Sequence, residues 1–502
     1  MYKIGTKISI SAFLFIVIIG IFFTAVFSPF STEKPRKSAE NTYNTNCGSC
    51  HLVPDPTKIP KSIWENSVLP EMAARMGYGN STKSSYPSPE IPMIDSTEWN
   101  QIEHYILSLA PDSIPNVPSR KGRTEELSQF KSSLQTLGNP NIAGAITNIQ
   151  YDTVSGYLFT ANVYGQVREW RNRFSITKYF DSPVVSTILK KDTLYLTEIG
   201  IMKPSEDARG AIYAMHQGKV TSLFTKLHRP VYTEISDLNE DGKNEIIICE
   251  FGNYTGELSM LVQKGSTFEK KTLLSLPGSI KVEVVDMNND GKKDIVALFS
   301  QGREGIYIFY QKENLQFDVE QVITLEPEYG SSWFSLLDYN NDGQLDIVLV
   351  NGDNADYSLF LKPYHGIRLF ISEGNNAFEQ KWFYPINGAT RVMAEDFDQD
   401  GDMDFAVSSF FPDFKNAPEE GFVYLENKDP APYSFVPHST KKAASGNWLV
   451  MDKGDFDQDG DVDIILGNFQ LFASEKIQTD KKHDFLYLEN NAIKNNSSPF
   501  NL

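Results

Sequence analysis

The chain has 502 residues, too many for one ordinary hydrophobic core, so we expect at least two domains. Its 65 acidic and 46 basic residues give a formal net charge of −19. That balance argues against nucleic acid as a partner, because phosphate binding needs a basic face. Aromatic residues make up 12% of the chain and hydrophobic residues 40%, which predicts a folded rather than a disordered body.

The chain begins with an apolar segment. Lys3 and Lys7 flank the start of an almost unbroken apolar run over residues 8–27. We expect residues 1–30 to be a signal anchor, because the run is long and no small-x-small cleavage site follows it. The two lysines then stay in the cytoplasm, and the rest of the chain is exported to the periplasm or cell surface, or secreted if the anchor is cleaved. Residues 31–40 are polar and are expected to form a short tether.

A C-x-x-C-H box follows the tether, at Cys47-Gly48-Ser49-Cys50-His51. This is the spacing of covalent c-type haem attachment: each thiol forms a thioether, and the adjacent histidine is an axial ligand of the iron. A zinc site would need further ligands nearby, but the next cysteine is Cys249, and a redox dithiol would not need the histidine. We therefore expect one covalent haem on Cys47 and Cys50, with His51 on the iron.

Residues 41–110 are expected to form a small all-α domain. Helical periodicity runs over residues 62–77, with a break near Leu69 because Pro70 cannot donate a backbone hydrogen bond. A second helix is expected over residues 97–109, with Ser96 as its N-cap. With the C-x-x-C-H box near its start and this helix at its end, the segment resembles a class I cytochrome c domain.

That resemblance implies a methionine as the sixth ligand of the iron. Met72 lies in a Leu-Pro-x-Met pattern beside the helix break, and Met93 lies just before the closing helix. The sequence leaves both open; Met76 is a weaker candidate and His104 is disfavoured.

After a Pro-rich linker over residues 111–127, residues 128–502 alternate short apolar runs with Gly, Asn and Asp turns. Five acidic loops there fit D-x-[DN]-x-D-G-x-x-[DE] and start at residues 237, 286, 338, 396 and 455, so successive starts are 49, 52, 58 and 59 residues apart. We number them loops one to five. Each precedes an apolar run, and such a period is typical of four-stranded propeller blades.

The acidic residues of the loops have the spacing of calcium ligands. Side-chain oxygens at positions 1, 3, 5 and 9, with a carbonyl at position 7, can surround Ca²⁺, while Gly at position 6 permits the sharp turn. Position 12 is apolar and a strand follows, so these are not EF-hands. We expect up to five calcium ions, with loop one the weakest site because its last ligand is Glu245. The expected ligands are Asp237, Asn239, Asp241, Glu245, Asp286, Asn288, Asp290, Asp294, Asp338, Asn340, Asp342, Asp346, Asp396, Asp398, Asp400, Asp404, Asp455, Asp457, Asp459 and Asp463.

These repeats resemble the FG-GAP/VCBS repeats of integrin-type and bacterial seven-bladed propellers. In that family the loops join adjacent strands of one blade and hold calcium structurally. Residues 145–170 and 184–220 read as two further blades without acidic loops, which makes seven. We expect a last strand at residues 484–488 to pair with an early strand and close the ring.

The sequence favours an exported, membrane-tethered electron-transfer protein that exchanges electrons with a redox partner protein or a quinone-linked donor. Two alternatives stay open: a quinoprotein-like dehydrogenase with a fused cytochrome, and a calcium-dependent binding or adhesion protein. No catalytic motif stands out, so enzyme status is undecided at this point.

Overall fold

The structure is a computed structural model that describes residues 33–78, 89, 91–114, 124–137, 144–171, 174–203, 205–252, 255–353, 360–429, 433–470 and 483–493. The chain separates into two compact units: residues 1–49 with 64–110, and residues 50–63 with 111–502. Within the described ranges, no helix is both long and apolar enough to span a membrane. The expected anchor over residues 1–30 lies outside those ranges.

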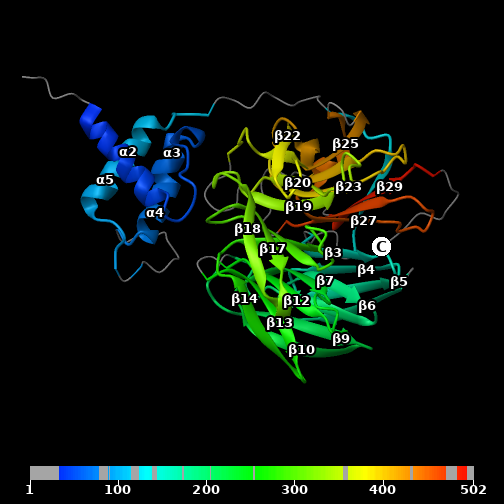
Figure 1. Ribbon diagram of the computed structural model, residues 1–502. Coiled ribbons are helices and arrows are strands. Elements are labelled where there is room, and N and C mark those ends of the chain that lie inside the picture. The colour runs from blue at the N-terminus through cyan, green and yellow to red at the C-terminus, as the bar shows by residue number, and fades with distance from the viewer. Residues whose placement is uncertain are drawn as a thin grey trace, which may run out of the picture. The chain divides into compact units, whose positions relative to one another are not determined.

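The helical elements are few and lie mostly in the first 110 residues (Figure 1). They are α2 (Glu33–Cys47), α3 (Lys61–Ile63), a π-helical turn (Trp64–Val68), α4 (Leu69–Arg75), α5 (Ser96–Leu109) and 3-10 turns at Pro56–Lys58, Glu313–Leu315, Pro418–Gly421 and Lys441–Ser445.

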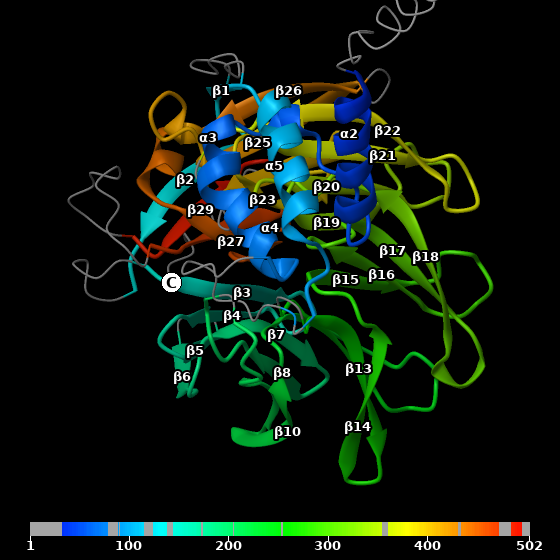
Figure 2. The same ribbon diagram turned by 90° about the vertical axis from the view of Figure 1, so that its left-hand side faces the viewer.

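In the first unit, α2 packs along α5, and Figures 1 and 2 both show the two helices side by side. The rings of Tyr43 and Tyr105 join them at a centroid distance of 5.3 Å, and Trp99, Ile102 and Ile106 of α5 are buried. Since α2 begins at Glu33, most of the expected tether over residues 31–40 is helical.

The helix break expected near Leu69 takes the form of a π-helical turn before α4, with Pro70 in the first turn of α4, where its missing N–H costs little. The N-cap of α5 differs from the expected Ser96. Asp95 caps it by accepting from the backbone N–H groups of Thr97 and Glu98, while the Glu98 carboxylate accepts from Asp95 N. A capping box with Asp at the cap and Glu three residues later satisfies more backbone donors than a serine one residue on.

The second unit is a seven-bladed β-propeller, as expected, with seven separate sheets. The first four blades, in chain order, are β3–β6 (Ile146–Asp152, Tyr157–Asn162, Gln166–Arg171, Phe174–Tyr179), β7–β10 (Val184–Lys190, Thr193–Glu198, Gly210–His216, Lys219–Leu227), β11–β14 (Pro230–Ser236, Glu245–Glu250, Glu257–Lys264, Thr267–Leu274) and β15–β18 (Ser279–Val285, Asp294–Phe299, Gly305–Gln311, Phe317–Thr324).

The last three blades continue this order, and the sixth and seventh also contain an early strand each. They are β19–β22 (Ser331–Leu337, Asp346–Asn351, Gly366–Ser372, Phe378–Pro385), β23–β26 (Ala389–Glu395, Asp404–Ser409, Phe422–Asp429, Ser434–Ser439) with β1 (Glu125–Glu126), and β27–β29 (Trp448–Gly454, Asp463–Asn468, Phe485–Asn490) with β2 (Phe130–Gln135).

The ring closes where early and late strands pair. β2 runs antiparallel to β29, with Phe130 opposite Asn490 and Gln135 opposite Phe485, so the expected closing strand is present. In addition, β1 pairs in parallel with β26, so the end of the expected linker over residues 111–127 already belongs to a blade.

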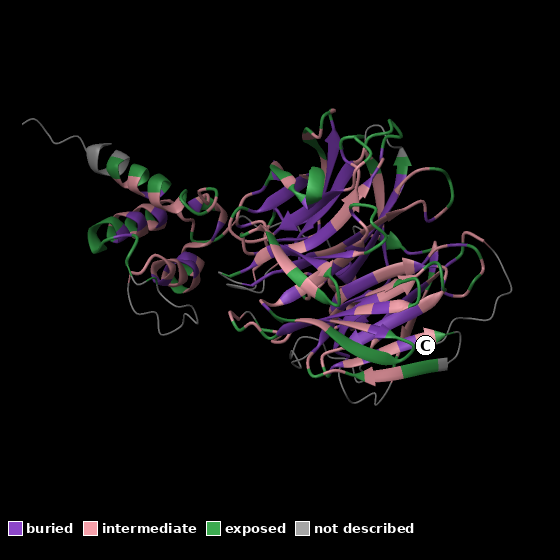
Figure 3. Ribbon diagram, turned by 60° about the horizontal axis from the view of Figure 1, so that its bottom comes forward, coloured by how far each residue is buried: buried purple, intermediate pink, exposed green. Residues whose placement is uncertain are grey.

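Burial explains why the apolar runs that follow the acidic loops are continuous rather than alternating. All six residues of each of β12, β16, β20, β24 and β28 are buried, because the blades on either side cover both faces of these second strands. The outermost strands β14, β18 and β22 consist almost entirely of partly buried and exposed positions. Figure 3 shows the buried positions running through the other strands.

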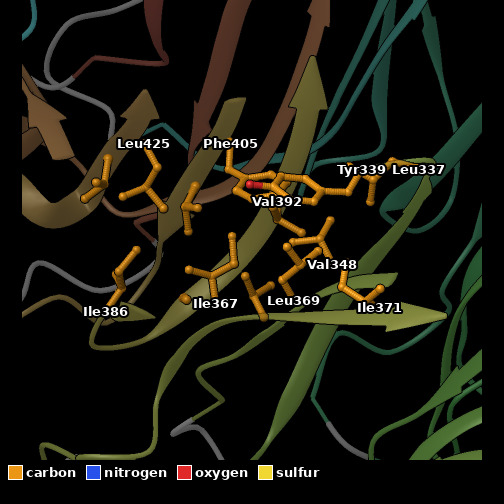
Figure 4. Packing of buried hydrophobic residues seen from close by; sticks show 14 residues of the cluster. Leu337, Tyr339, Val348, Ile367, Leu369, Ile371, Ile386, Val392, Phe405 and Leu425 are labelled. Carbon is orange, nitrogen blue, oxygen red and sulfur yellow. The ribbon is translucent and has the colours of Figure 1, made fainter. Parts of the chain in front are cut away.

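The second residue of each acidic loop is apolar or aromatic and anchors the loop in the core. Each of these side chains joins a cluster that contains residues of its own blade and of the next, and in Figure 4 Tyr339 lies over Phe405 of the following blade. The Tyr339 and Phe405 rings stack at a centroid distance of 6.2 Å. The five residues are Leu238, Met287, Tyr339, Phe397 and Phe456. The acidic loops are therefore fixed between blades.

Candidate haem box and calcium loops

The C-x-x-C-H box begins at the last residue of α2. Cys47 ends the helix, and the following N–H groups of Gly48 and Ser49 still donate to the carbonyls of Asn44 and Asn46, at 3.0 and 3.3 Å. The chain therefore continues to turn between the two cysteines. Cys47 is half-buried and Cys50 is exposed, which suits thiols that must react with a prosthetic group.

The ring of His51 is oriented by a backbone carbonyl. Its Nδ1 lies 2.6 Å from Leu52 O. Since a carbonyl can only accept, Nδ1 carries the proton, and Nε2 is the unprotonated ring nitrogen. A metal-binding histidine commonly has its second nitrogen held in this way. The residues of the box therefore fit a c-type haem.

The structure places the candidate sixth ligands in different environments. Met72 is half-buried in α4, whereas Met93 is 52% exposed in the turn before α5. Met76 follows α4, and its carbonyl accepts a hydrogen bond from Met93 N at 2.8 Å, so Met76 and Met93 lie close together. His104 is exposed on α5. The third cysteine, Cys249, is buried in β12, where burial raises its thiol pKa well above the usual value. It therefore has the character of an inert core residue.

Each acidic loop joins the first and second strands of one blade, as expected. Loops one to five follow β11, β15, β19, β23 and β27. Within each loop the Asp at position 1 accepts from the backbone N–H groups of positions 5 and 6; in loop two, Asp290 N and Gly291 N lie 3.2 and 2.8 Å from the Asp286 carboxylate. The Asp at position 5 accepts in turn from the N–H of position 7. These Asx-type turns wrap the chain around the side-chain oxygens.

Glycine at position 6 is required by the backbone angle and not by space. Gly242, Gly291 and Gly343 have φ of +84°, and Gly401 has +102°, yet a Cβ on any of them would meet nothing within 4 Å. Only glycine adopts such angles without strain. The turn that reverses the loop therefore depends on this residue.

The carboxylate at position 9 holds each loop to its blade. In loops two to five one oxygen accepts from the N–H of position 2, and the other accepts from an N–H in the last residues of the third strand. Asp463 does so with Phe456 N at 3.2 Å and Asn490 N at 2.8 Å. Glu245 of loop one accepts from Leu238 N in the same way at 3.0 Å. The longer Glu245 side chain thus preserves the contact with position 2.

Loops four and five concentrate negative charge more than the others. Ligand oxygens of Asp396, Asp398 and Asp404 lie within 4.8 Å of one another, and so do those of Asp455, Asp457 and Asp459. Burial, with repulsion from neighbouring aspartates, raises the pKa of Asp404 to about 7 and that of Asp463 to about 8. Carboxylates arranged in this way are stabilised by a cation between them.

Two further acids, which the sequence analysis did not assign as ligands, add to the negative charge of loops four and five. Position 7 is Asp402 in loop four and Asp461 in loop five, and in each an Oδ1 is buried without a hydrogen-bond partner among the described residues. The equivalent residues in loops one and two are Lys243 and Lys292. An Asp-Gly-Asp pattern at positions 5 to 7 identifies these extra acids in the sequence. By the donor set and the orphaned oxygens, loops four and five fit a calcium ion best.

Tyrosines on the third strands distinguish the same two loops. Tyr424 Oη donates to Asp404 Oδ2 at 2.6 Å, and Tyr487 Oη donates to Asp463 Oδ2 at 2.8 Å. Each tyrosine lies on the third strand, opposite the second-strand residue that comes two after position 9. In the other three loop-bearing blades the residues at this position are apolar: Met260, Ile308 and Leu369.

Comparison with known proteins supports the propeller repeats. The FG-GAP-like repeat matches residues 237–297 and 286–349, which contain loops one to three. A T-cell immunomodulatory protein homolog from Plasmodium falciparum (isolate 3D7) is 22% identical over 262 residues, covering 46% of this chain and 36% of that protein, so the chain spans about a third of this relative's length.

Two solved structures resemble the propeller weakly. The N-terminal domain of Nup159 gives a TM-score of 0.41 at 10% identity, and the Neurospora crassa Pan2 WD40 domain gives 0.44 at 12% identity. Each match covers 73% of this chain, and 97% and 96% of those chains. At these TM-scores the likeness carries no argument, and the blade count rests on the seven sheets. The chain thus contains FG-GAP-like repeats carried on a seven-bladed β-propeller.

Proposed function

We propose that this protein is an exported, membrane-tethered electron-transfer protein with one covalent c-type haem and a calcium-binding propeller scaffold. The observation that carries the proposal is the C-x-x-C-H box at the end of α2, with His51 Nδ1 committed to Leu52 O. Cys47 and Cys50 would hold the haem, and His51 Nε2 would bind the iron. When bound, the haem supplies a one-electron couple between ferric and ferrous iron.

The residues of the chain perform the remaining tasks. The Leu52 carbonyl fixes the tautomer and the orientation of the His51 ring, and makes the imidazole a better donor. Met72 or Met93 would be the sixth ligand, and a thioether there raises the reduction potential. Calcium in the acidic loops, first in loops four and five, would neutralise their carboxylates and stiffen the contacts between blades.

The partner is a redox protein or a quinone-linked donor outside the cytoplasm. Support for that location comes from the apolar run over residues 8–27 and from the haem box itself. The net charge of −19 favours a partner with a basic docking face, because complementary charge accelerates encounter.

A redox titration of the purified full-length protein tests the proposal. We expect c-type absorption bands on reduction, a single one-electron transition, and reduction by a quinol-linked donor. Absence of these bands would overturn the assignment. Reduction of the haem by a sugar or an alcohol, without any donor protein, would instead favour the dehydrogenase alternative.

Two single variants identify the sixth ligand. We expect one of Met72→Leu and Met93→Leu to abolish the absorption band typical of methionine-bound ferric haem and to lower the reduction potential, while the other leaves both unchanged. His104→Gln is the matched control and should behave like the unmodified protein. If neither methionine variant changes the spectrum, the sixth ligand is neither Met72 nor Met93.

A further inference from the structure

Seven inner strands surround the axis of the propeller. The first strand of each blade contacts the first strand of the next, and β27 returns to contact β3. In all seven strands the register is irregular between the first and third residues. Such an irregularity re-aims the following side chain in the same way in each blade. The third residues therefore occupy equivalent positions, which we call the axial ring: Asn148, Ser186, Tyr232, Lys281, Trp333, Arg391 and Val450.

Three members of the axial ring meet across the axis. The guanidinium of Arg391 lies 3.6 Å from the ring centre of Trp333, and the Tyr232 ring meets Trp333 edge-on at 5.5 Å and 87°. Tyr232 belongs to β11 and Trp333 to β19, and the blade of β15 lies between theirs. Side chains from blades that are not neighbours touch only by reaching towards the axis.

These three side chains offer donors that have no acceptor. The Arg391 guanidinium, the Tyr232 hydroxyl and the Trp333 indole N–H make no hydrogen bond to another described residue, and no described carboxylate lies within 4.0 Å of Arg391. All three residues are partly exposed, so solvent reaches them. A cation inside a protein normally has an anionic partner.

The neighbouring carboxylates Glu283 and Asp452 already have hydrogen-bond or ion-pair partners. Glu283 contacts Lys281 Nζ at 2.6 Å and accepts from Leu336 N at 3.3 Å, and Asp452 accepts from Tyr151 N at 2.6 Å. Burial lowers the pKa of Arg391 only to about 10, so the guanidinium stays charged at neutral pH. Glu234, Glu283 and Asp452 act on Tyr232 or Arg391 through space, but none of them is hydrogen-bonded to either side chain. The axial ring thus combines a positive charge with donors that are not used in hydrogen bonds to the described residues.

We propose that the axial ring binds a small oxyanion, a carboxylate or a phosphate, on the planar fork of Arg391. Two parallel N–H groups of a guanidinium match two oxygens of such an anion, and the Tyr232 hydroxyl and Trp333 N–H can supply further donors. The ligand is small because seven strands enclose the site. This binding does not depend on the haem and is a second function, separate from electron transfer.

Calorimetric titration of the calcium-loaded full chain tests the proposal, after free calcium is removed by gel filtration. The probes are acetate, succinate, sulfate and inorganic phosphate. We expect saturable binding of one equivalent of at least one probe, and the ranking of the probes separates a carboxylate from a phosphate ligand. An absence of saturable binding by all four would overturn the proposal.

Variants locate the site. Arg391→Gln should weaken binding at least tenfold, Arg391→Lys should weaken it less because the charge is kept without the fork, and Tyr232→Phe should weaken it about threefold. The control is Arg209→Gln, because Arg209 is exposed and outside the axial ring. Thermal unfolding verifies that each variant is folded. If Arg391→Gln does not fold, unchanged affinity in both Arg391→Lys and Tyr232→Phe would equally overturn the proposal.

Discussion

The helical unit and the propeller differ in what holds them together. In the helical unit a few helices bury a small core around Trp64, Trp99 and Ile102, and its chemistry depends on a group that the chain must acquire. A core of this size rarely supplies enough stability alone. In the propeller, five second strands are buried at every position and seven blades cover one another. The first unit should therefore depend on its ligand for order, and the second should depend on its own strands, with cations adding to them.

The largest expected effect is loss of the haem. The double variant Cys47→Ser/Cys50→Ser should contain no covalent haem and should lose helical order in residues 33–110, while the propeller unfolds at its usual temperature. Haem staining after denaturing electrophoresis and hydrogen exchange measure the two effects. Ser49→Ala, a change inside the same box, is the control and should retain haem. Covalent haem in the double variant would contradict the assignment.

Removal of calcium is expected to destabilise the propeller and to leave the haem-bearing helical unit unchanged. A site held at 100 times its Kd adds about 2.7 kcal/mol to folding, and each kcal/mol shifts Tm by roughly 2–4 °C in a domain of 150–250 residues and by less in this larger propeller. Chelation by EDTA should therefore lower the Tm of the propeller by about 10 °C if loops four and five are both occupied, and should leave the haem spectrum unchanged. Calorimetric melting with and without EDTA measures this. An unchanged Tm would mean that the loops are held by their own hydrogen bonds.

The anchoring of the loops can be tested without any cation. Phe397, the second residue of loop four, is 1% exposed and packs between two blades. Phe397→Ala should cost about 3–5 kcal/mol of the free energy of unfolding, since it removes a buried aromatic ring. Val319→Ala on the exposed face of β18 is the control and should change this free energy by less than about 0.5 kcal/mol. Denaturant titration in EDTA compares them, and equal costs would contradict the anchoring role.

The last expected effect is a pH dependence of the propeller's stability, which develops gradually over several pH units. Burial raises the pKa of Glu304 to about 8, against hydrogen bonds from Ser331 that lower it. Because the folded state binds this proton more tightly than the unfolded state, its stability falls as pH rises from about 4.5 through 8. Glu304→Gln should flatten this fall, which Tm measurements between pH 5 and 9 would show. An identical slope in the variant would exclude Glu304 as the cause.

Sequence reasoning located those features that a short stretch of chain defines by itself. The acidic loops, the apolar strands after them and the C-x-x-C-H box each occupy fewer than about fifteen consecutive residues, so periodicity and ligand spacing identify them. The helix over most of residues 31–40 was missed, because its polar composition gives no amphipathic signal. Asp95 was missed as the cap because the adjacent Ser96 is an equally good candidate.

The features that sequence reasoning missed in the propeller depend on distant residues. Leu238 and Phe397 lie beside predicted ligands, but their role appears only when the next blade is in place. Tyr232, Trp333 and Arg391 are separated by many residues, and a register irregularity in each strand brings them together. No local pattern encodes such a meeting.

The pairing of β2 with β29 also sets an order of events during synthesis. Gln129 and Asn490, joined by a hydrogen bond at this seam, are 361 residues apart in the chain. A ribosome delivers the early strand first, so the edges of β1 and β2 stay unpaired until nearly the whole chain has emerged. Unpaired edges of this kind are sites of aggregation. If the chain is exported as we propose, residues 485–490 of β29, which come late in the chain, decide whether the exported propeller is a closed ring or an open one.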